Sequence, residues 1–196
     1  TLSIHSFPTR RSSDLKVQSF IDIYDDMSKN IKTDKKALIL YSTMTGRTKK
    51  IATIIKENFE SKNIHSEIMD VNKIPKEEVI KAINEADAIF FGSSTKYADI
   101  TSNMEDILKS LSDLNLENKI GAAFGSYGWS GEAIEVVQDY LRETNIKVLS
   151  TAGVIKSTGM IDIEFPIRIK FSPSLNNVKN IENAVVYTAD LLLSTI

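Results

Sequence analysis

The junction between a strand and a helix at residues 36–48 constrains the fold of this chain more than any other stretch. Residues 36–41 (KALILY) form an apolar run that is typical of a buried parallel strand. Residues 42–48 (STMTGRT) follow as a polar turn that is rich in hydroxyls and holds one glycine. A helical pattern begins directly after this turn. Its apolar face is formed by Ile51, Ala52, Ile54, Ile55 and Phe59.

This turn has the chemistry of a phosphate cradle. Backbone N–H groups and the positive end of the helix dipole converge there, and Gly46 lets the backbone approach an anion closely. The hydroxyls of Thr43, Thr45 and Thr48 add neutral donors. The turn lacks the lysine of a nucleoside triphosphate loop and the three glycines of a dinucleotide loop. We therefore predict a terminal monophosphate such as that of FMN; the alternative is an ordinary turn in which Thr48 caps the helix.

Strand and helix patterns alternate along the rest of the chain, which predicts a parallel sheet with helices on both faces. Five strands suit the flavodoxin-like order 2-1-3-4-5, so the expected fold class is α/β with a doubly wound five-stranded sheet. Residues 161–171 alternate enough for an extra strand, although Pro166 and Pro173 interrupt it. The expected strands are 36–41, 65–71 (at an edge), 87–92, 119–125 and 147–155, and further helical faces lie at 75–86, 104–114, 133–141 and 178–192.

Two more polar loops follow the third and fourth predicted strands, at residues 92–99 (GSSTKYAD) and 125–131 (GSYGWSG). With the order 2-1-3-4-5, the carboxyl ends of the first, third and fourth strands lie together, so all three loops should line one crevice. Tyr127 and Trp129 are large aromatic residues between glycines. They can stack on a planar ring such as a flavin while backbone N–H groups meet its polar edge. The alternative is a partner-binding surface or a capped helix start.

Residues 124–131 (FGSYGWSG) resemble the third flavin loop of the flavodiiron proteins, also called A-type flavoproteins. Residues 42–48 resemble the phosphate loop of that family, and residues 92–97 resemble its Gly-Ser-Pro-Thr loop. The resemblance covers residues 17–196 and implies FMN as the cofactor. The implied cofactor-binding residues are Thr43, Met44, Thr45, Gly46, Arg47 and Thr48, then Ser94, Thr95, Lys96 and Tyr97, and finally Ser126, Tyr127, Gly128, Trp129 and Ser130.

The chain departs from this family pattern at several positions. Thr45 stands where the family often has an aromatic residue, Arg47 replaces an asparagine, and Ser94 replaces a proline. Ala98 and Asp99 stand where asparagines often contact the ring. An acid that points inward there would disfavour an anionic reduced flavin and lower its potential. These departures bear on affinity and potential more than on the identity of the cofactor.

The resemblance implies one half of a two-part enzyme. In that family an upstream metallo-β-lactamase-like domain holds two irons and reduces dioxygen or nitric oxide, and the FMN domain passes electrons to it across a head-to-tail dimer. This chain has two histidines, His5 and His65, and no cysteine, so it cannot build a multi-histidine diiron centre. We expect an electron carrier rather than a complete enzyme, with no catalytic or metal-binding residue of its own. Its implied partners are that diiron domain, a rubredoxin-like protein or NAD(P)H reductase, and a second copy in a homodimer.

Two other functions are compatible with the sequence. A stand-alone flavodoxin-like reductase would take hydride from NAD(P)H, and its flavin would bleach rapidly when NADH or NADPH is added without oxygen. A flavin-free interaction module would stay colourless when FMN is added. The departures at Arg47 and Ser94 keep this last alternative open.

Composition limits the possible binding partners and the cellular location. A net charge of −2 implies neither nucleic acid nor an anionic membrane surface as a partner. No apolar run approaches the roughly 20 residues of a membrane span, so a cytoplasmic location is expected. Residues 1–15 include a stretch that resembles a translated sequencing adapter, and we predict that they are a non-native leader. We expect residues 16–35 to be a helix and linker from a missing upstream domain, and residues 36–196 to be the FMN domain.

Overall fold

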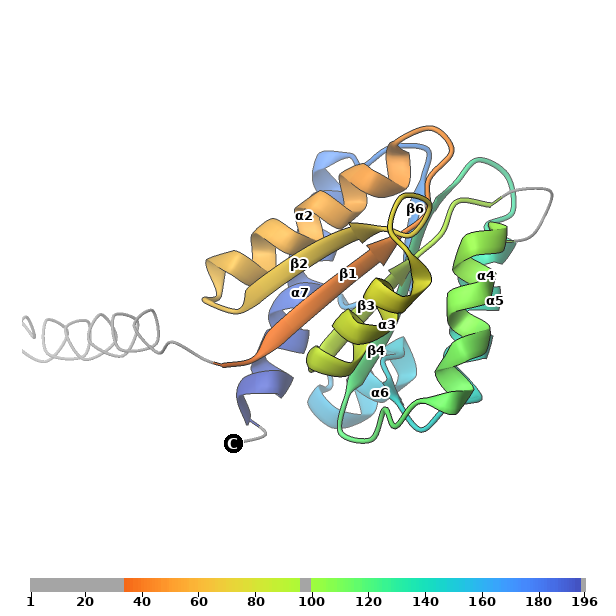
Figure 1. Ribbon diagram of the computed structural model, residues 1–196. Helices are drawn as coiled ribbons and strands as arrows, with labels where there is room; N and C mark the ends of the chain where they lie inside the picture. The colour runs from red at the N-terminus through yellow and green to blue at the C-terminus, as the bar shows by residue number, and fades with distance from the viewer. Residues whose placement is uncertain (1–33, 96–99, 195–196) are drawn as a thin grey trace, which may run out of the picture. The chain divides into compact units, whose positions relative to one another are not determined.

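The computed structural model of this 196-residue chain describes residues 34–95 and 100–194, which form a doubly wound α/β fold (Figure 1). The leader and the helix expected within residues 1–33 lie outside the described residues. The strands are β1 (Lys36–Tyr41), β2 (His65–Asp70), β3 (Ala88–Gly92), β4 (Ile120–Tyr127), β5 (Lys147–Val148) and β6 (Ile167–Lys170). The helices are α2 (Arg47–Ser61), α3 (Lys76–Glu85), α4 (Ser102–Ser110), the 3-10 turn η1 (Leu111–Asp113), α5 (Glu132–Arg142), α6 (Thr151–Thr158) and α7 (Leu175–Ser194).

The strand order β2-β1-β3-β4-β5 confirms the predicted topology, and all the recorded pairings are parallel. β1 has the predicted bounds, and β2 lies at an edge as expected. β4 continues through Tyr127, whereas the sequence analysis ended this strand at Gly125. The extension follows from a sixth strand, β6, which pairs with β4 from Phe124 to Tyr127.

The predicted fifth strand at residues 147–155 is wrong beyond Val148. Ser150 adopts an extended backbone, and its side-chain oxygen accepts a hydrogen bond of 3.2 Å from the backbone N–H of Gly153. This N-cap starts α6 where the sequence pattern continued a strand. The edge is completed by β6, which lies within the alternating stretch at residues 161–171 and shows the expected alternation of buried and exposed residues.

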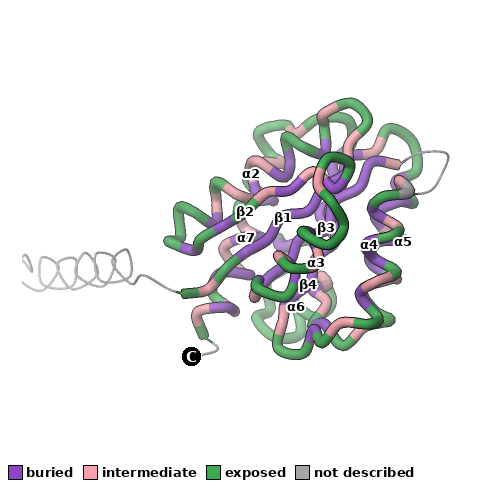
Figure 2. Tube along the Cα trace, viewed as in Figure 1, coloured by how far each residue is buried: buried purple, intermediate pink, exposed green. Residues whose placement is uncertain are grey.

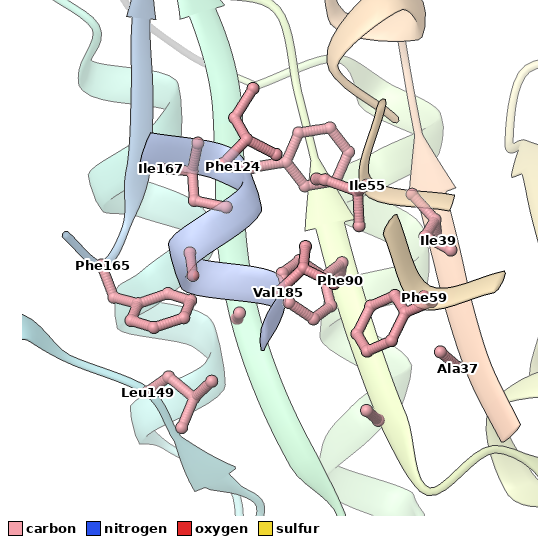
Figure 3. Packing of buried hydrophobic residues seen from close by; sticks show 14 of the residues in the cluster. Ala37, Ile39, Ile55, Phe59, Phe90, Phe124, Leu149, Phe165, Ile167 and Val185 are labelled. Carbon is pink, nitrogen blue, oxygen red and sulfur yellow. The ribbon is translucent and has the colours of Figure 1, made fainter. Parts of the chain in front are cut away.

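Two apolar layers hold the sheet between its helices, as the buried tube segments in Figure 2 show. One layer packs α2 and α7 on the sheet, and the other packs α3, α4 and α5 on its opposite face. Neighbouring residues of β1 divide between them, with Ile39 in the first layer and Leu40 in the second. In the first layer Phe59 of α2 meets Phe90 of β3 edge-to-face, with ring centroids 5.4 Å apart (Figure 3). The layers fix the carboxyl ends of β1, β3 and β4 side by side.

Within the described residues, no helix combines the length and the apolar character that crossing a membrane requires. The longest, α7, covers one face of the sheet with buried residues that include Ile181, Val185 and Leu192. The apolar face of α7 therefore packs in the core of the domain.

Candidate functional site

The three loops of the predicted crevice meet at the side chain of Thr48. Its hydroxyl oxygen lies 2.9 Å from the hydroxyl oxygen of Ser94, in the second loop, and 3.2 Å from that of Ser126, at the end of β4. All three residues are buried. From the sequence, Thr48 is predicted to bind a phosphate or to cap the helix. In the structure its hydroxyl joins the three segments, and the N-cap of the helix is Gly46.

Backbone hydrogen bonds extend the sheet just beyond the strand ends and form the floor of this site. Ser42 N–H donates to the carbonyl oxygen of Gly92 at 2.8 Å, and Ser94 N–H donates to that of Ser42 at 3.2 Å. Ser93 N–H donates to the carbonyl oxygen of Phe124 at 3.3 Å. A Cβ on Gly125 would lie 2.5 Å from the Ser93 carbonyl oxygen, so only glycine allows this approach. The loops therefore start from a rigid common base.

Replacing Thr48 with valine is expected to lower the free energy of unfolding by about 1–3 kcal/mol, because it leaves two buried serine hydroxyls without this partner. Thr53→Val is the matched control on the same helix, since the Thr53 hydroxyl donates to the Lys49 carbonyl near the surface. The control should change stability by less than about 0.5 kcal/mol. Urea denaturation of both variants measures the difference, and equal effects would contradict the role given to Thr48.

The first loop leaves the N-terminus of α2 open to an anion. Gly46 is the N-cap, with a φ of 76°, and no side chain caps the helix there. The Gly46 N–H donates to the hydroxyl of Thr43 at 2.9 Å, which tightens the turn. The first turn of α2 contains no acidic residue but carries Arg47 and two lysines. Open backbone donors with added positive charge suit a phosphate group.

The second loop contains a polar atom that lacks a partner. The hydroxyl oxygen of Thr95 is buried and has no hydrogen-bond partner among the described residues. A buried hydroxyl in this state costs free energy, so a bound group with a polar edge would be stabilised by it. Ser94 is buried beside Thr48, whereas Lys96 and Tyr97 lie outside the described residues.

The third loop presents an aromatic side chain to solvent. Ser126 and Tyr127 belong to β4 rather than to the loop, so the loop proper begins at Gly128. The side chain of Trp129 is 95% exposed. The hydroxyl of Ser130 donates to the carboxylate of Glu132 at the start of α5. An indole with so little packing is available to stack on a planar ligand.

The remaining predicted residues of the first loop are placed at its rim. Met44 is 59% exposed, and Thr45 and Arg47 are also exposed, while Thr43 is half-buried. Burial, with a smaller contribution from the carboxylate of Asp70, raises the pKa of the Tyr41 phenol just below this loop above its usual value of 10.0. The phenol is therefore neutral near pH 7 and adds no negative charge below the phosphate turn.

Sequence reasoning missed three residues that contact the site. Asn72 and Thr101 each donate a side-chain hydrogen bond to the hydroxyl oxygen of Ser42, at 3.0 and 2.5 Å. Phe171 donates its backbone N–H to the carbonyl oxygen of Tyr127 at 2.7 Å. Asn72 and Phe171 come just after the carboxyl ends of β2 and β6. Position at a strand end was the signal that could have found them.

Several curated relatives of this chain are much longer proteins. Rubredoxin-oxygen oxidoreductase from Megalodesulfovibrio gigas is 28% identical over 141 residues, which are 72% of this chain and 34% of that protein. Flavo-diiron protein FprA2 from Clostridium acetobutylicum is 31% identical over 128 residues, which are 64% of this chain and 32% of that protein. The chain thus spans about a third of the length of these relatives.

Solved structures and a family match complete the comparison. A flavodoxin from the domain Archaea superimposes with a TM-score of 0.65 and 31% identity, covering 80% of this chain and 98% of that one. The rubredoxin oxygen:oxidoreductase from Desulfovibrio gigas shares the fold, with a TM-score of 0.71 and 24% identity over 93% of this chain and 41% of that one. Residues 39–164 match the family described as Flavodoxin. Together with the strand order, this match shows that the chain belongs to the flavodoxin family.

Proposed function

We propose that this domain binds FMN in the three-loop crevice and acts as an electron carrier. The observation that supports this most directly is the pair of hydrogen bonds that joins the hydroxyl of Thr48 to those of Ser94 and Ser126. These bonds bring the three predicted cofactor-binding segments together. The open N-terminus of α2 and the unpartnered hydroxyl of Thr95 fit a ligand that has both an anionic group and a polar edge. FMN has both features.

The proposed roles divide between the loops. Residues 43–48 hold the phosphate through backbone N–H groups and threonine hydroxyls. Residues 94–97 and 126–130 surround the ring, with Trp129 available for stacking and Thr95 for a hydrogen bond to the polar edge. FMN, when bound, supplies the redox chemistry, and the protein supplies binding, orientation and electrostatic tuning.

We further propose that the electrons pass to a diiron domain that reduces dioxygen or nitric oxide. The support is similarity to proteins named rubredoxin-oxygen oxidoreductase and nitric oxide reductase, of which this chain spans 34% and 30%. A rubredoxin-like protein or an NAD(P)H reductase would supply the electrons, and a homodimer would bring the two centres together. In this proposal the bound FMN carries the electrons, and no side chain is required to act as a general acid or base.

The test is a titration of the full chain with FMN, followed by the visible spectrum and the quenching of flavin fluorescence. One FMN per chain, with quenched fluorescence and a complex that survives dialysis, is the expected result. Unquenched and freely dialysable FMN would refute the proposed function. Adding NADH or NADPH to the complex without oxygen tests the carrier role, because rapid bleaching without a separate reductase would identify a reductase instead.

A further inference from the structure

Phe171 holds an unusual backbone conformation beside the crevice. Its φ is 63°, in the left-handed region that a bulky aromatic residue rarely adopts. The hydrogen bond from its N–H to the carbonyl oxygen of Tyr127 fixes this conformation just after β6. The side chain is 52% exposed, so burial of the ring does not account for the strain. Strain of this kind persists where the surroundings impose it, and often at functional sites.

Two cations lie near the Phe171 ring. The guanidinium carbon of Arg47 lies 5.9 Å from the ring centroid, and the ammonium nitrogen of Lys170 lies 5.7 Å from it. Both distances are within the range in which a cation is attracted to an aromatic face. Across residues 34–95 and 100–194, the ion pairs recorded do not include either cation. Among these described residues, the ring therefore lies near two cations for which no ion pair with a carboxylate is recorded.

This cluster connects two of the cofactor loops. Arg47 is the first residue of α2, directly after Gly46, so it belongs to the phosphate turn. An atom of the Phe171 ring lies 3.6 Å from the position that a Cβ on Gly128 would occupy, so the ring also lies against the third loop. Figure 1 shows the β6–α7 connection at the same end of the sheet as the turn into α2.

The charge at the start of α2 is unfavourable without an anion. Arg47, Lys49 and Lys50 are in the first turn of the helix, where the dipole disfavours cations, and no acidic residue offsets them. A bound phosphate would reverse the sign of this interaction. The cations at the start of α2 are thus a cost of the free protein that an anion at this place would offset. The backbone strain at Phe171 is a separate cost, which comes with the position of its ring after β6.

We propose that Phe171 is a positioning residue of the cofactor site. Its ring holds Arg47 beside the phosphate turn and, together with the nearby Lys170, makes a neutral cradle cationic. The site then selects a phosphorylated flavin over riboflavin through charge. This inference rests on the proposed binding of FMN and names the feature that would determine its selectivity.

The experiment compares the dissociation constants of FMN and riboflavin, by fluorescence quenching, for the full chain and its variants. Phe171→Asn removes the ring, while asparagine tolerates the left-handed backbone, so the fold should be retained or stabilised. It should weaken FMN roughly two- to five-fold and leave riboflavin unchanged. Phe171→Tyr keeps the ring and should bind both flavins like the wild type. Leu175→Ala removes a side chain that is 90% exposed and serves as the control.

A double-variant cycle tests the link between the two side chains. Arg47→Gln should weaken FMN at least as much as Phe171→Asn, and both should reduce the decline of FMN affinity with added salt. The double variant should bind FMN more tightly than the sum of the two single effects implies, because part of the effect of the ring passes through Arg47.

Two results would refute the role of Phe171 without refuting the proposed binding of FMN. One is a ratio of FMN to riboflavin affinity that stays at its wild-type value in Phe171→Asn; the other is strict additivity of the two substitutions. A wild-type protein that binds neither flavin would refute the proposed function, and this inference with it. Binding of FMN with an unchanged ratio would refute only the role of Phe171.

Discussion

Gly46→Asp is expected to abolish FMN binding while the domain stays folded. Gly46 has a φ of 76°, a conformation that aspartate and asparagine tolerate better than other residues. A Cβ at this position would have no atom within 4 Å, so the side chain fits. The new carboxylate would stand in the phosphate turn. Two unit charges about 5 Å apart repel by about 3 kcal/mol at an effective dielectric constant of about 20, which weakens binding more than about 100-fold.

Gly46→Asn is the matched control, because it has the same shape and backbone preference but no charge. It should retain most of the affinity for FMN, and circular dichroism should show that both variants are folded. The cradle assignment fails if Gly46→Asp binds FMN within tenfold of the wild type. An equal loss in both variants would place the effect in the backbone rather than in the charge.

Gly92→Ala is expected to have the largest effect on stability. A Cβ there would lie between 2.2 and 2.6 Å from three atoms of the Phe124 ring. Phe124 is completely buried, so its ring cannot move aside without displacing the first apolar layer (Figure 3). Overpacking typically costs about 1–3 kcal/mol, and this close contact with a buried ring places the expected cost at about 3 kcal/mol. That is a large part of the roughly 5–15 kcal/mol that stabilises a typical domain.

Urea denaturation followed by circular dichroism measures the effect. Gly128→Ala is the control, because its Cβ would meet the Phe171 ring at an ordinary distance of 3.6 Å. Phe124→Leu in the Gly92→Ala background frees space, so the double variant should be more stable than the sum of the two single effects implies. A Gly92→Ala protein with the wild-type urea midpoint would contradict the close packing of β3 against Phe124.

The strand order could be predicted from the sequence because buried parallel strands are nearly continuous apolar runs. β1 and β3 are of this kind, and their bounds were found to within a residue. The stretch after Val148 was predicted to continue a strand, yet it forms α6. The difference lies in a cap at Ser150, whose effect depends on its backbone conformation. β6 was weakly signalled because its pairing with β4 is long-range.

The site was predictable where chemistry follows a strand end directly, as in the turn at residues 42–48. The side-chain contacts between the three loops could not be predicted, because they join residues that are distant in sequence. The sequence predicts that the Thr48 hydroxyl donates a hydrogen bond to a phosphate or caps the helix. Its contacts with Ser94 and Ser126 exist only once the sheet has formed. Phe171 lacks any local motif, and its contact with Arg47 depends on the position of β6.

Two short strands, β5 and β6, share the edge of the sheet next to β4, and the segment between them can change in length. β5 pairs with Ile120 and Gly121 of β4, and β6 pairs with Phe124 to Tyr127, so each is anchored separately. The connection between α6 and β6, residues 159–166, carries exposed side chains at Met160 and Ile161. Lengthening a loop costs little entropy. Additional sequence can therefore be accommodated in this segment, in evolution or by engineering, while the crevice at the other end of β6 keeps its geometry.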